Sequence, residues 1–197
     1  MSAYPIHVKI QRGLYYVHLY SALEKVVNET VEQALLVIGS HSIPNHKFQT
    51  KFNVIALNGK MTAFKNCGSR EYFNKSIDIF EAVNSTEVTN INNAVLSGTL
   101  QNVWFSTIQT TLKSFCIAPL TVDPRVILTV DEVVNKRNAV AHGRETPVVV
   151  GERFRCQMLR IKTTEVQLVC DMFVDAFENY LRNAEFVKQE HRPEYVA

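Results

Sequence analysis

The sequence predicts an all-α protein, a helical bundle with one long helix near each end of the chain. Glycine and proline are scarce, at 7 and 6 of 197 residues, whereas globular proteins usually carry about 7% and 5%. Turn-rich β folds use both residues freely, so this composition favours helices. Apolar residues recur at intervals of three and four within residues 12–38 and again after residue 164, which is typical of long amphipathic helices.

The composition is that of an ordinary globular protein. Apolar residues make up 46% of the chain, charged residues make up 20%, and the formal net charge is +2. These values exclude a disordered or collagen-like chain. At about 150 residues per domain, the length predicts a single domain over residues 1–197, with a frayed, charged tail after about residue 187.

Several features favour a cytoplasmic protein without a membrane segment. The four cysteines form no C-x-x-C pair and match no zinc pattern, which is typical of reduced, buried thiols. Charged and polar residues precede any apolar block at the N-terminus, unlike in a signal peptide. No run approaches the roughly 18 apolar residues that a membrane-spanning helix needs.

The first long helix is expected over residues 12–38. Its buried stripe runs from Leu19 to Ile38, and charged or amide residues lie between the apolar positions. Glu24 falls among these polar neighbours and is expected to be exposed. Gly39 supplies a C-terminal stop.

The middle of the chain predicts shorter elements. Residues 40–50 indicate a loop, because Pro44 disfavours helix at the residue before it. Shorter helices are expected near 51–58, 70–83 and 99–116, separated by turns rich in Asn and Ser.

The next helix has two alternative starts. Asp123 can accept a backbone N–H as an N-cap, and Pro124 fits the first helical position. A capping box that begins at Thr129 is the second choice. Either helix continues to His142 and meets Gly143, which suits the left-handed residue after a helix end.

Residues 146–162 allow two interpretations. A β-branched run, a glycine and a mixed apolar-basic run fit a small hairpin or a loop insertion leading into the last helix. A capping box at Thr164 and Gln167 predicts the start of that helix. Its apolar stripe extends from Val166 to Leu181.

One helix end carries residues suited to chemistry on a phosphate. Residues five apart on a helix are separated by about 140°, so Arg137 and His142 cannot share a face of a regular helix. His142 is therefore expected at the helix end, where the helix dipole favours its protonated form and where it can exchange a proton near neutral pH. The planar guanidinium of Arg137 matches a phosphate, and the amide of Asn138 can orient either group.

These residues resemble a known motif. Arg137-Asn138-x-x-x-His142, followed by Gly143, is similar to the R-x4-6-H motif of the HEPN superfamily, and RNAVAHG is close to the form seen in its RiboL-PSP-type branch. Glu132, four residues before Lys136, resembles an E-x3-K-R feature of some HEPN nucleases. As in those proteins, the motif lies late in the chain, before a final helix.

The resemblance implies an all-α, metal-independent endoribonuclease without a cofactor. It implies that two copies dimerise so that two motifs form one composite site, with Arg137 and His142 catalytic and Asn138 orienting them. RNA, tRNA among its forms, is then the substrate, and the cell context is a prokaryotic toxin or antiphage defence effector with an antitoxin or regulatory partner. One alternative is a catalytically inactive HEPN module that dimerises and binds RNA or protein. Another is a structural helical protein in which the motif arises by chance, with His142 capping carbonyls and Arg137 paired with an acidic side chain.

Other charged residues near the motif are weaker candidates. Residues 136–162 carry a net charge of +5 and the rest of the chain −3, which places positive charge where RNA would bind. The supporting or RNA-binding candidates are Glu132, Lys136, Arg144, Arg153 and Arg155. By spacing alone, Glu132 and Lys136 also fit a surface ion pair. Arg153, Arg155, Arg160 and Lys162 also fit a solvated face.

Overall fold

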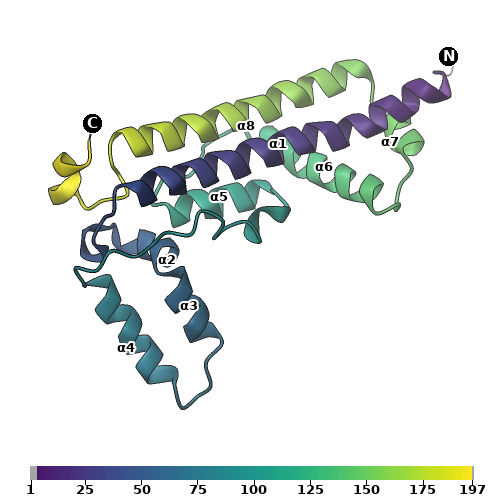
Figure 1. The fold of residues 1–197 in the computed structure, drawn as a ribbon. Helices are drawn as coiled ribbons and strands as arrows, with labels where there is room; N and C mark the ends of the chain where they lie inside the picture. The colour runs from purple at the N-terminus through teal and green to yellow at the C-terminus, as the bar shows by residue number, and fades with distance from the viewer. Residues whose placement is uncertain (1–3, 197) are drawn as a thin grey trace. The chain divides into compact units, whose positions relative to one another are not determined.

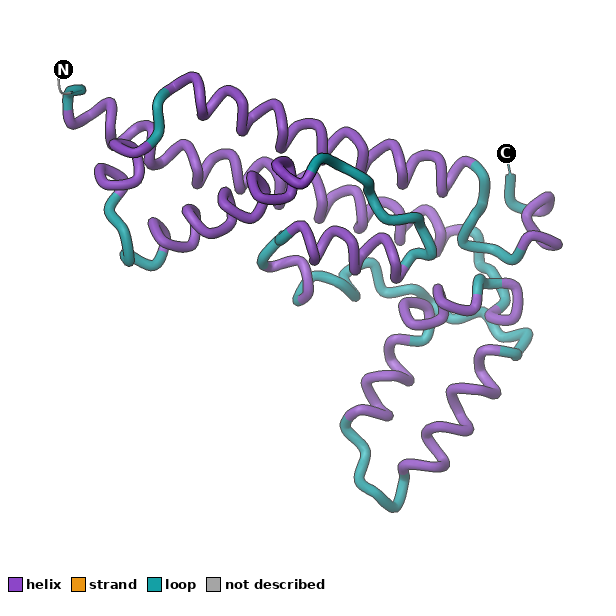
Figure 2. The backbone as a smooth tube through the Cα atoms, turned by 180° about the vertical axis from the view of Figure 1, so that it is seen from behind, coloured by secondary structure: helices purple, strands orange, loops and turns teal. Residues whose placement is uncertain are grey.

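Helices are the only regular secondary structure in the computed structural model, which describes residues 4–196 (Figure 1). The α-helices are α1 (Ile6–Ser40), α2 (Asn53–Ala56), α3 (Asn58–Lys65), α4 (Tyr72–Val83), α5 (Phe105–Ser114), α6 (Pro124–Ala141), α7 (Pro147–Arg153) and α8 (Cys156–Arg182). Short 3-10 helices cover Asn45–Lys47, Thr50–Phe52, Thr99–Gln101 and Gln189–Glu194. Figure 2 shows helix and loop alone along this range. The predicted all-α class is confirmed.

The internal contacts of the chain divide into two compact units. Unit 1 comprises Met1–Asn28, Thr99–Gln109 and Leu120–Val174, and unit 2 comprises Glu29–Gly98, Thr110–Pro119 and Asp175–Ala197. Helices α1, α5 and α8 each contribute residues to both units. The single domain expected from the length stays a prediction.

Unit 1 packs α6, α7 and the first part of α8 around the first part of α1. Its fully buried side chains come from all four helices, among them Tyr16, Val130, Val150 and Val169. The hydroxyls of Tyr15 and Thr163 share a hydrogen bond of 2.6 Å, which joins α1 to α8. This arrangement gives α6 one face against α1.

Helices α1 and α7 cross in backbone contact. A Cβ atom added at Gly13 would lie 2.0 Å from the carbonyl oxygen of Pro147, and one added at Gly151 would lie 1.7 Å from that of Lys9. No side chain fits at either distance. Glycine at both positions is therefore what permits this crossing.

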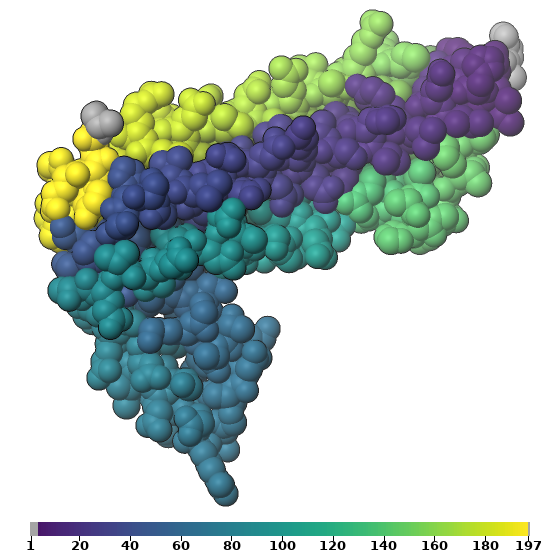
Figure 3. All heavy atoms as spheres, in the orientation of Figure 1, coloured from purple at the N-terminus to yellow at the C-terminus, as the bar shows by residue number. Residues whose placement is uncertain are grey.

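Unit 2 has an aromatic core. Phe115 contacts Phe52 and Phe177, with ring centroids 5.8 and 4.8 Å apart, and Tyr180 contacts Phe186 at 5.8 Å. Helices α3 and α4 form a helical hairpin whose side chains are drawn in blue in Figure 3.

The segment 146–162 is helical, so the expected hairpin or loop insertion is wrong. Pro147 occupies the first turn of α7, and Thr146 caps it by accepting a hydrogen bond from the Val149 N–H at 3.4 Å. Helix α8 begins at Cys156, eight residues before the predicted capping box. The hydroxyl of Thr164 instead donates to the Arg160 carbonyl within the helix, at 3.2 Å.

Other boundaries also differ from the predicted ones. Helix α1 begins six residues earlier, at Ile6. The helix expected near 51–58 is a 3-10 turn followed by the short helix α2, with α3 beginning only at Asn58. The helix expected near 99–116 shortens to α5 after a 3-10 turn. Within the described range, residues 189–194 form a 3-10 helix and Lys47 pairs with Glu194 at 2.5 Å. The frayed tail stays a prediction.

Within residues 4–196, no helix is both long and apolar enough to cross a membrane.

Candidate functional site

Helix α6 carries the predicted motif at its C-terminal end. The helix starts as the first of the two alternatives predicted, with Asp123 Oδ1 accepting a hydrogen bond from the Arg125 N–H at 2.8 Å. It ends at Ala141, so His142 is the C-cap residue, and Gly143 takes a left-handed conformation with φ of 68°. The chain therefore turns immediately after the motif.

The buried stripe of α6 explains where Arg137 points. Val126, Val130 and Val133 are buried at helical spacing, and Arg137 lies one turn further along the same stripe. Its guanidinium is thereby directed toward α1, and only 18% of the side chain is exposed.

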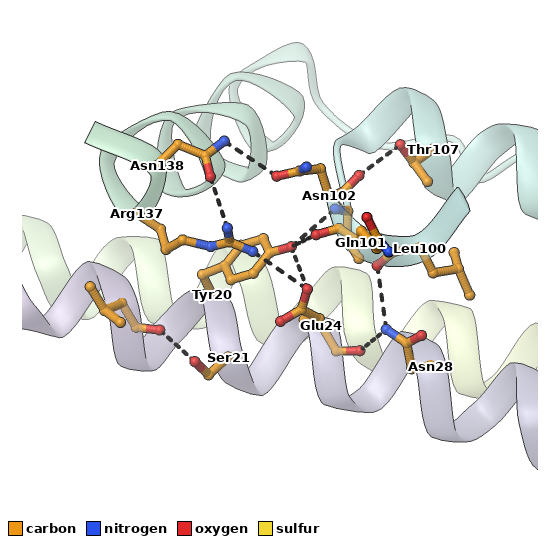
Figure 4. A network of polar contacts seen from close by, with 12 residues as sticks. Tyr20, Ser21, Glu24, Asn28, Leu100, Gln101, Asn102, Thr107, Arg137 and Asn138 are labelled. Atoms are coloured by element: carbon orange, nitrogen blue, oxygen red, sulfur yellow. Dashed lines mark hydrogen bonds and ion pairs between the residues drawn. The ribbon is translucent and has the colours of Figure 1, made fainter. Parts of the chain in front are cut away.

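Three side chains hold the Arg137 guanidinium (Figure 4). Its central carbon lies 3.6 Å from the centroid of the Tyr20 ring, which is a cation–π contact. Nη2 donates to Glu24 Oε1 at 3.4 Å, and Nη1 donates to Asn138 Oδ1 at 2.9 Å. Stacking and two hydrogen bonds together fix the plane of the guanidinium.

Tyr20 and Glu24 are themselves fixed. The Tyr20 hydroxyl lies 2.8 Å from Glu24 Oε1 and 3.1 Å from the Gln101 carbonyl oxygen, and it accepts a hydrogen bond from the Val103 N–H at 3.3 Å. Burial, and next the hydrogen bond to Glu24, raises the pKa of Tyr20. The phenol therefore stays protonated at neutral pH and donates to the carboxylate.

The segment around residue 102 closes the network. Asn138 Nδ2 donates to Asn102 Oδ1 at 3.3 Å, and Asn28 Nδ2 lies 3.5 Å from the Leu100 carbonyl oxygen (Figure 4). Asn138 thus bridges Arg137 and this segment, which places its amide beside Arg137 as the sequence suggested.

His142 stands apart from the network. Its backbone N–H donates to the Asn138 carbonyl at 3.1 Å. Its side chain is exposed, and within residues 4–196 no hydrogen bond or ion pair joins the ring to another residue. One copy of the chain therefore brings Arg137 and Asn138 together and leaves the imidazole of His142 open to solvent.

Three of the weaker candidates, Glu132, Lys136 and Arg153, form ion pairs that the spacing did not predict. Glu132 pairs with Lys162 at 2.5 Å, rather than with Lys136. Lys136 pairs with Glu145 at 3.1 Å, and Arg153 pairs with the same carboxylate at 3.2 Å. The hydrogen bond from Lys136, with a further contribution from Arg153, holds the pKa of Glu145 below its ordinary value.

Lys162 was expected on a solvated face, but its side chain is only 8% exposed, so that expectation is wrong. Arg144 and Arg155 are exposed and form no ion pair among the residues described. Arg144 lines an open groove of about 640 Å³ along α6, together with Lys136 and Ala139, and this groove includes neither Arg137 nor His142.

Tyr20 is a site residue that sequence reasoning missed, and Glu24 lies at the site, a position that the resemblance to HEPN domains had left open for it. Glu24 was expected to be exposed among polar neighbours, whereas its side chain is 35% exposed and faces Arg137. The signal available was the spacing of Tyr20, Glu24 and Asn28 by four residues, which places all three on one side of α1.

Comparison with known proteins identifies the family. The RiboL-PSP-HEPN family model matches residues 1–183, a range that contains all of unit 1, unit 2 as far as residue 183, and the whole network around Arg137. Neither the comparison with curated proteins nor that with solved structures gave a match. HEPN domains commonly bind RNA and dimerise, so the match supports a role related to RNA. The resemblance that the sequence suggested is confirmed at this level: the chain belongs to the RiboL-PSP-HEPN family.

Proposed function

We propose that the protein is a metal-independent endoribonuclease whose active site forms from two R-x4-H motifs at a homodimer interface. The observation that carries this proposal is the end of α6. There an oriented guanidinium, Arg137, and an imidazole exposed to solvent, His142, lie five residues apart in a chain of the HEPN family.

Arg137 is suited to stabilise charge on a phosphate. Attack of the RNA 2′-OH on the neighbouring phosphate builds negative charge on the phosphorane oxygens, and a guanidinium held in advance stabilises that charge by a few kcal/mol. Tyr20, Glu24 and Asn138 hold Arg137 in this way. Its orientation then costs little when RNA binds.

His142 is suited to move a proton. An imidazole acts as general base or general acid near neutral pH and accelerates such reactions by about 10²- to 10⁴-fold. Cleavage requires a base for the 2′-OH and an acid for the leaving 5′-oxygen, while each chain supplies one motif histidine. A second copy of the chain supplies the other, which is why we propose a homodimer.

This chemistry predicts the products and the substrate. The expected ends are a 2′,3′-cyclic phosphate, or the 3′-phosphate formed by its opening, and a 5′-OH. DNA lacks the 2′-OH and should resist cleavage. In the cell we propose a prokaryotic toxin or antiphage effector that is restrained by an antitoxin or regulatory protein.

The second candidate is an inactive HEPN module that dimerises and binds RNA or protein. The observation in its favour is that Arg137 already has hydrogen-bond partners within its own chain. Glu24 offsets its charge, and Asn138 occupies one of its donors. An arginine so engaged can serve to join α1 to α6 without contacting a phosphate.

Cleavage of total tRNA and of a long single-stranded RNA in EDTA distinguishes the two candidates. Arg137→Ala and His142→Ala should each lose cleavage. Arg125→Ala, an exposed arginine of the same helix, and His18→Ala, an exposed histidine of α1, are the matched controls and should retain it. Absence of cleavage between pH 6 and 9, with RNA binding intact in a folded protein, would establish the inactive module instead.

A further inference from the structure

A pocket with two arginines in its lining lies in unit 1, between the start of α8 and the first part of α1. It is a depression of about 410 Å³, and its polar lining comes from Gln11, Arg12, Tyr15, Cys156 and Arg160. No carboxylate is among the described residues that line it. The pocket shares no residue with the network around Arg137.

Arg12 is a buried cation that hydrogen-bonds to the Cys156 thiol and the Tyr4 hydroxyl but pairs with no carboxylate among the described residues. Only 7% of the residue is exposed, and its Nε has no hydrogen-bond partner. Its guanidinium carbon lies 4.0 Å from the centroid of the Tyr4 ring, and no ion pair joins it to any residue between 4 and 196. Buried charges are normally paired, because an unpaired one loses its hydration without compensation.

The charge of Arg12 persists in this setting. Burial lowers the pKa of Arg12, but interactions with the Cys156 thiol and the Tyr4 hydroxyl outweigh that effect and raise it above the ordinary arginine value. The guanidinium therefore remains a cation at every physiological pH, and the pocket keeps a positive charge that no carboxylate among the described residues offsets.

The surroundings add further positive potential. Helix α8 is 27 residues long and begins at Cys156, a residue of the pocket lining, so the positive end of its dipole lies at the pocket. Arg155 and Arg160 are exposed and, within the described part of the chain, form no ion pair. The nearby Glu152 is already paired with Lys9 at 2.6 Å.

We propose that this pocket binds a phosphate group of the RNA strand, outside the cleavage site, with Arg12 and Arg160 as its ligands. An arginine fork matches two phosphate oxygens, and a helix N-terminus offers further donors. This inference rests on the proposed function for its choice of RNA as the source of the phosphate. It assigns the pocket to strand positioning and gives it no part in the chemical step.

The test measures binding separately from cleavage. A fluorescein-labelled, single-stranded RNA with 2′-O-methyl groups keeps every phosphate but lacks the nucleophile, so its affinity can be followed by anisotropy in EDTA over a salt series. Arg160→Gln and Arg12→Gln should each weaken binding by about three- to tenfold. Each should also reduce the slope of log K against log salt by about 0.7, the value for one lost single-strand contact.

Arg182→Gln is the matched control, because Arg182 is an exposed arginine of the same helix, far along the chain from the pocket. Its salt slope should equal that of the wild type. Thermal unfolding checks that Arg12→Gln folds. If it does not fold, Arg160→Gln still decides the test, because Arg160 is exposed and its replacement should leave the fold intact. Equal slopes for Arg160→Gln and Arg182→Gln would overturn the proposal.

A measurement with inorganic phosphate distinguishes an RNA phosphate from free phosphate as the ligand of this pocket. If millimolar phosphate stabilises the wild type but not Arg160→Gln, while RNA affinity is the same for both, the assignment to RNA is overturned in favour of a free phosphate. Cleavage of unmodified RNA is scored separately. A protein that binds RNA through this pocket but never cleaves it would contradict the proposed function and leave this inference standing.

Discussion

At the scale of single residues, the setting of Arg137 depends on one carboxylate. Glu24 Oε1 lies within hydrogen-bond distance of both the Tyr20 hydroxyl and Arg137 Nη2. Glu24→Gln keeps the size of the side chain and removes its charge. We expect kcat for RNA cleavage to fall about tenfold with KM little changed, because the guanidinium loses orientation rather than its affinity for phosphate.

Glu81→Gln, an exposed carboxylate on α4 in unit 2, is the control for Glu24→Gln and should cleave RNA at the wild-type rate. If Glu24→Gln lowered only the melting temperature, at unchanged kcat, Glu24 would be a structural partner of Arg137 and not a positioning residue.

Glu145 makes part of the stability dependent on pH. Lys136 lowers the pKa of this carboxyl in the folded chain, so its contribution is present above the unfolded value of about 4.3 and is lost as pH falls through the folded value. Between pH 7 and pH 3, the melting temperature of Glu145→Gln should therefore start below that of the wild type and converge with it in acid. Glu190→Gln, at an exposed position, should follow the wild-type curve throughout; parallel curves for Glu145→Gln would contradict this account.

At the scale of elements, the crossing of α1 and α7 allows no side chain at its centre. A Cβ at Gly151 would lie 1.7 Å from the Lys9 carbonyl oxygen, which is backbone and cannot rotate away. Gly151→Ala should lower the free energy of unfolding by about 2–4 kcal/mol, since the two helices must separate. Urea denaturation followed by circular dichroism measures this loss.

Gly59→Ala is the matched control for the crossing. Gly59 lies within α3, and nothing would lie within 4 Å of its added Cβ. Alanine there should leave stability unchanged or raise it by about 0.5–1 kcal/mol, because alanine favours helix. Equal stability of Gly151→Ala and Gly59→Ala would show that the crossing adjusts freely.

The sequence could predict the helices that carry their own local signals, but not the helix that depends on the crossing with α1. Helices α1 and α6 were predictable because their own signals, a long apolar stripe and the Asp123-Pro124 start, agree with the fold. Helix α7 was not, because its β-branched run favours a strand and its burial depends on contact with Gly13, more than 130 residues away. Local patterns carry no information about such a partner.

The contacts of the candidate site also differ in whether the sequence could predict them. Arg137 and Asn138 are neighbours in sequence, and their pairing could be anticipated from the motif. The ion pair of Arg137 with Glu24 spans 113 positions. It became visible only when the structure placed α6 beside α1.

At the scale of the whole molecule, the proposed active site is completed only by a second copy. Each chain presents one exposed His142 at the end of α6. If one histidine acts as base and the other as acid, removing either should cost about as much as removing both. Residues that act as one catalytic unit are strongly non-additive in this way.

A heterodimer tests this dependence directly. Wild-type and His142→Ala chains carrying different affinity tags are co-expressed, and the mixed dimer is purified through both tags in sequence. We expect it to cleave RNA at least about 100-fold more slowly than the wild-type dimer, because one proton transfer lacks its catalyst. A mixed dimer with His18→Ala, whose histidine is exposed on α1, should keep full activity. Half of the wild-type rate in the His142→Ala heterodimer would mean that each chain cleaves alone, and the composite site would be wrong even if the nuclease activity were real.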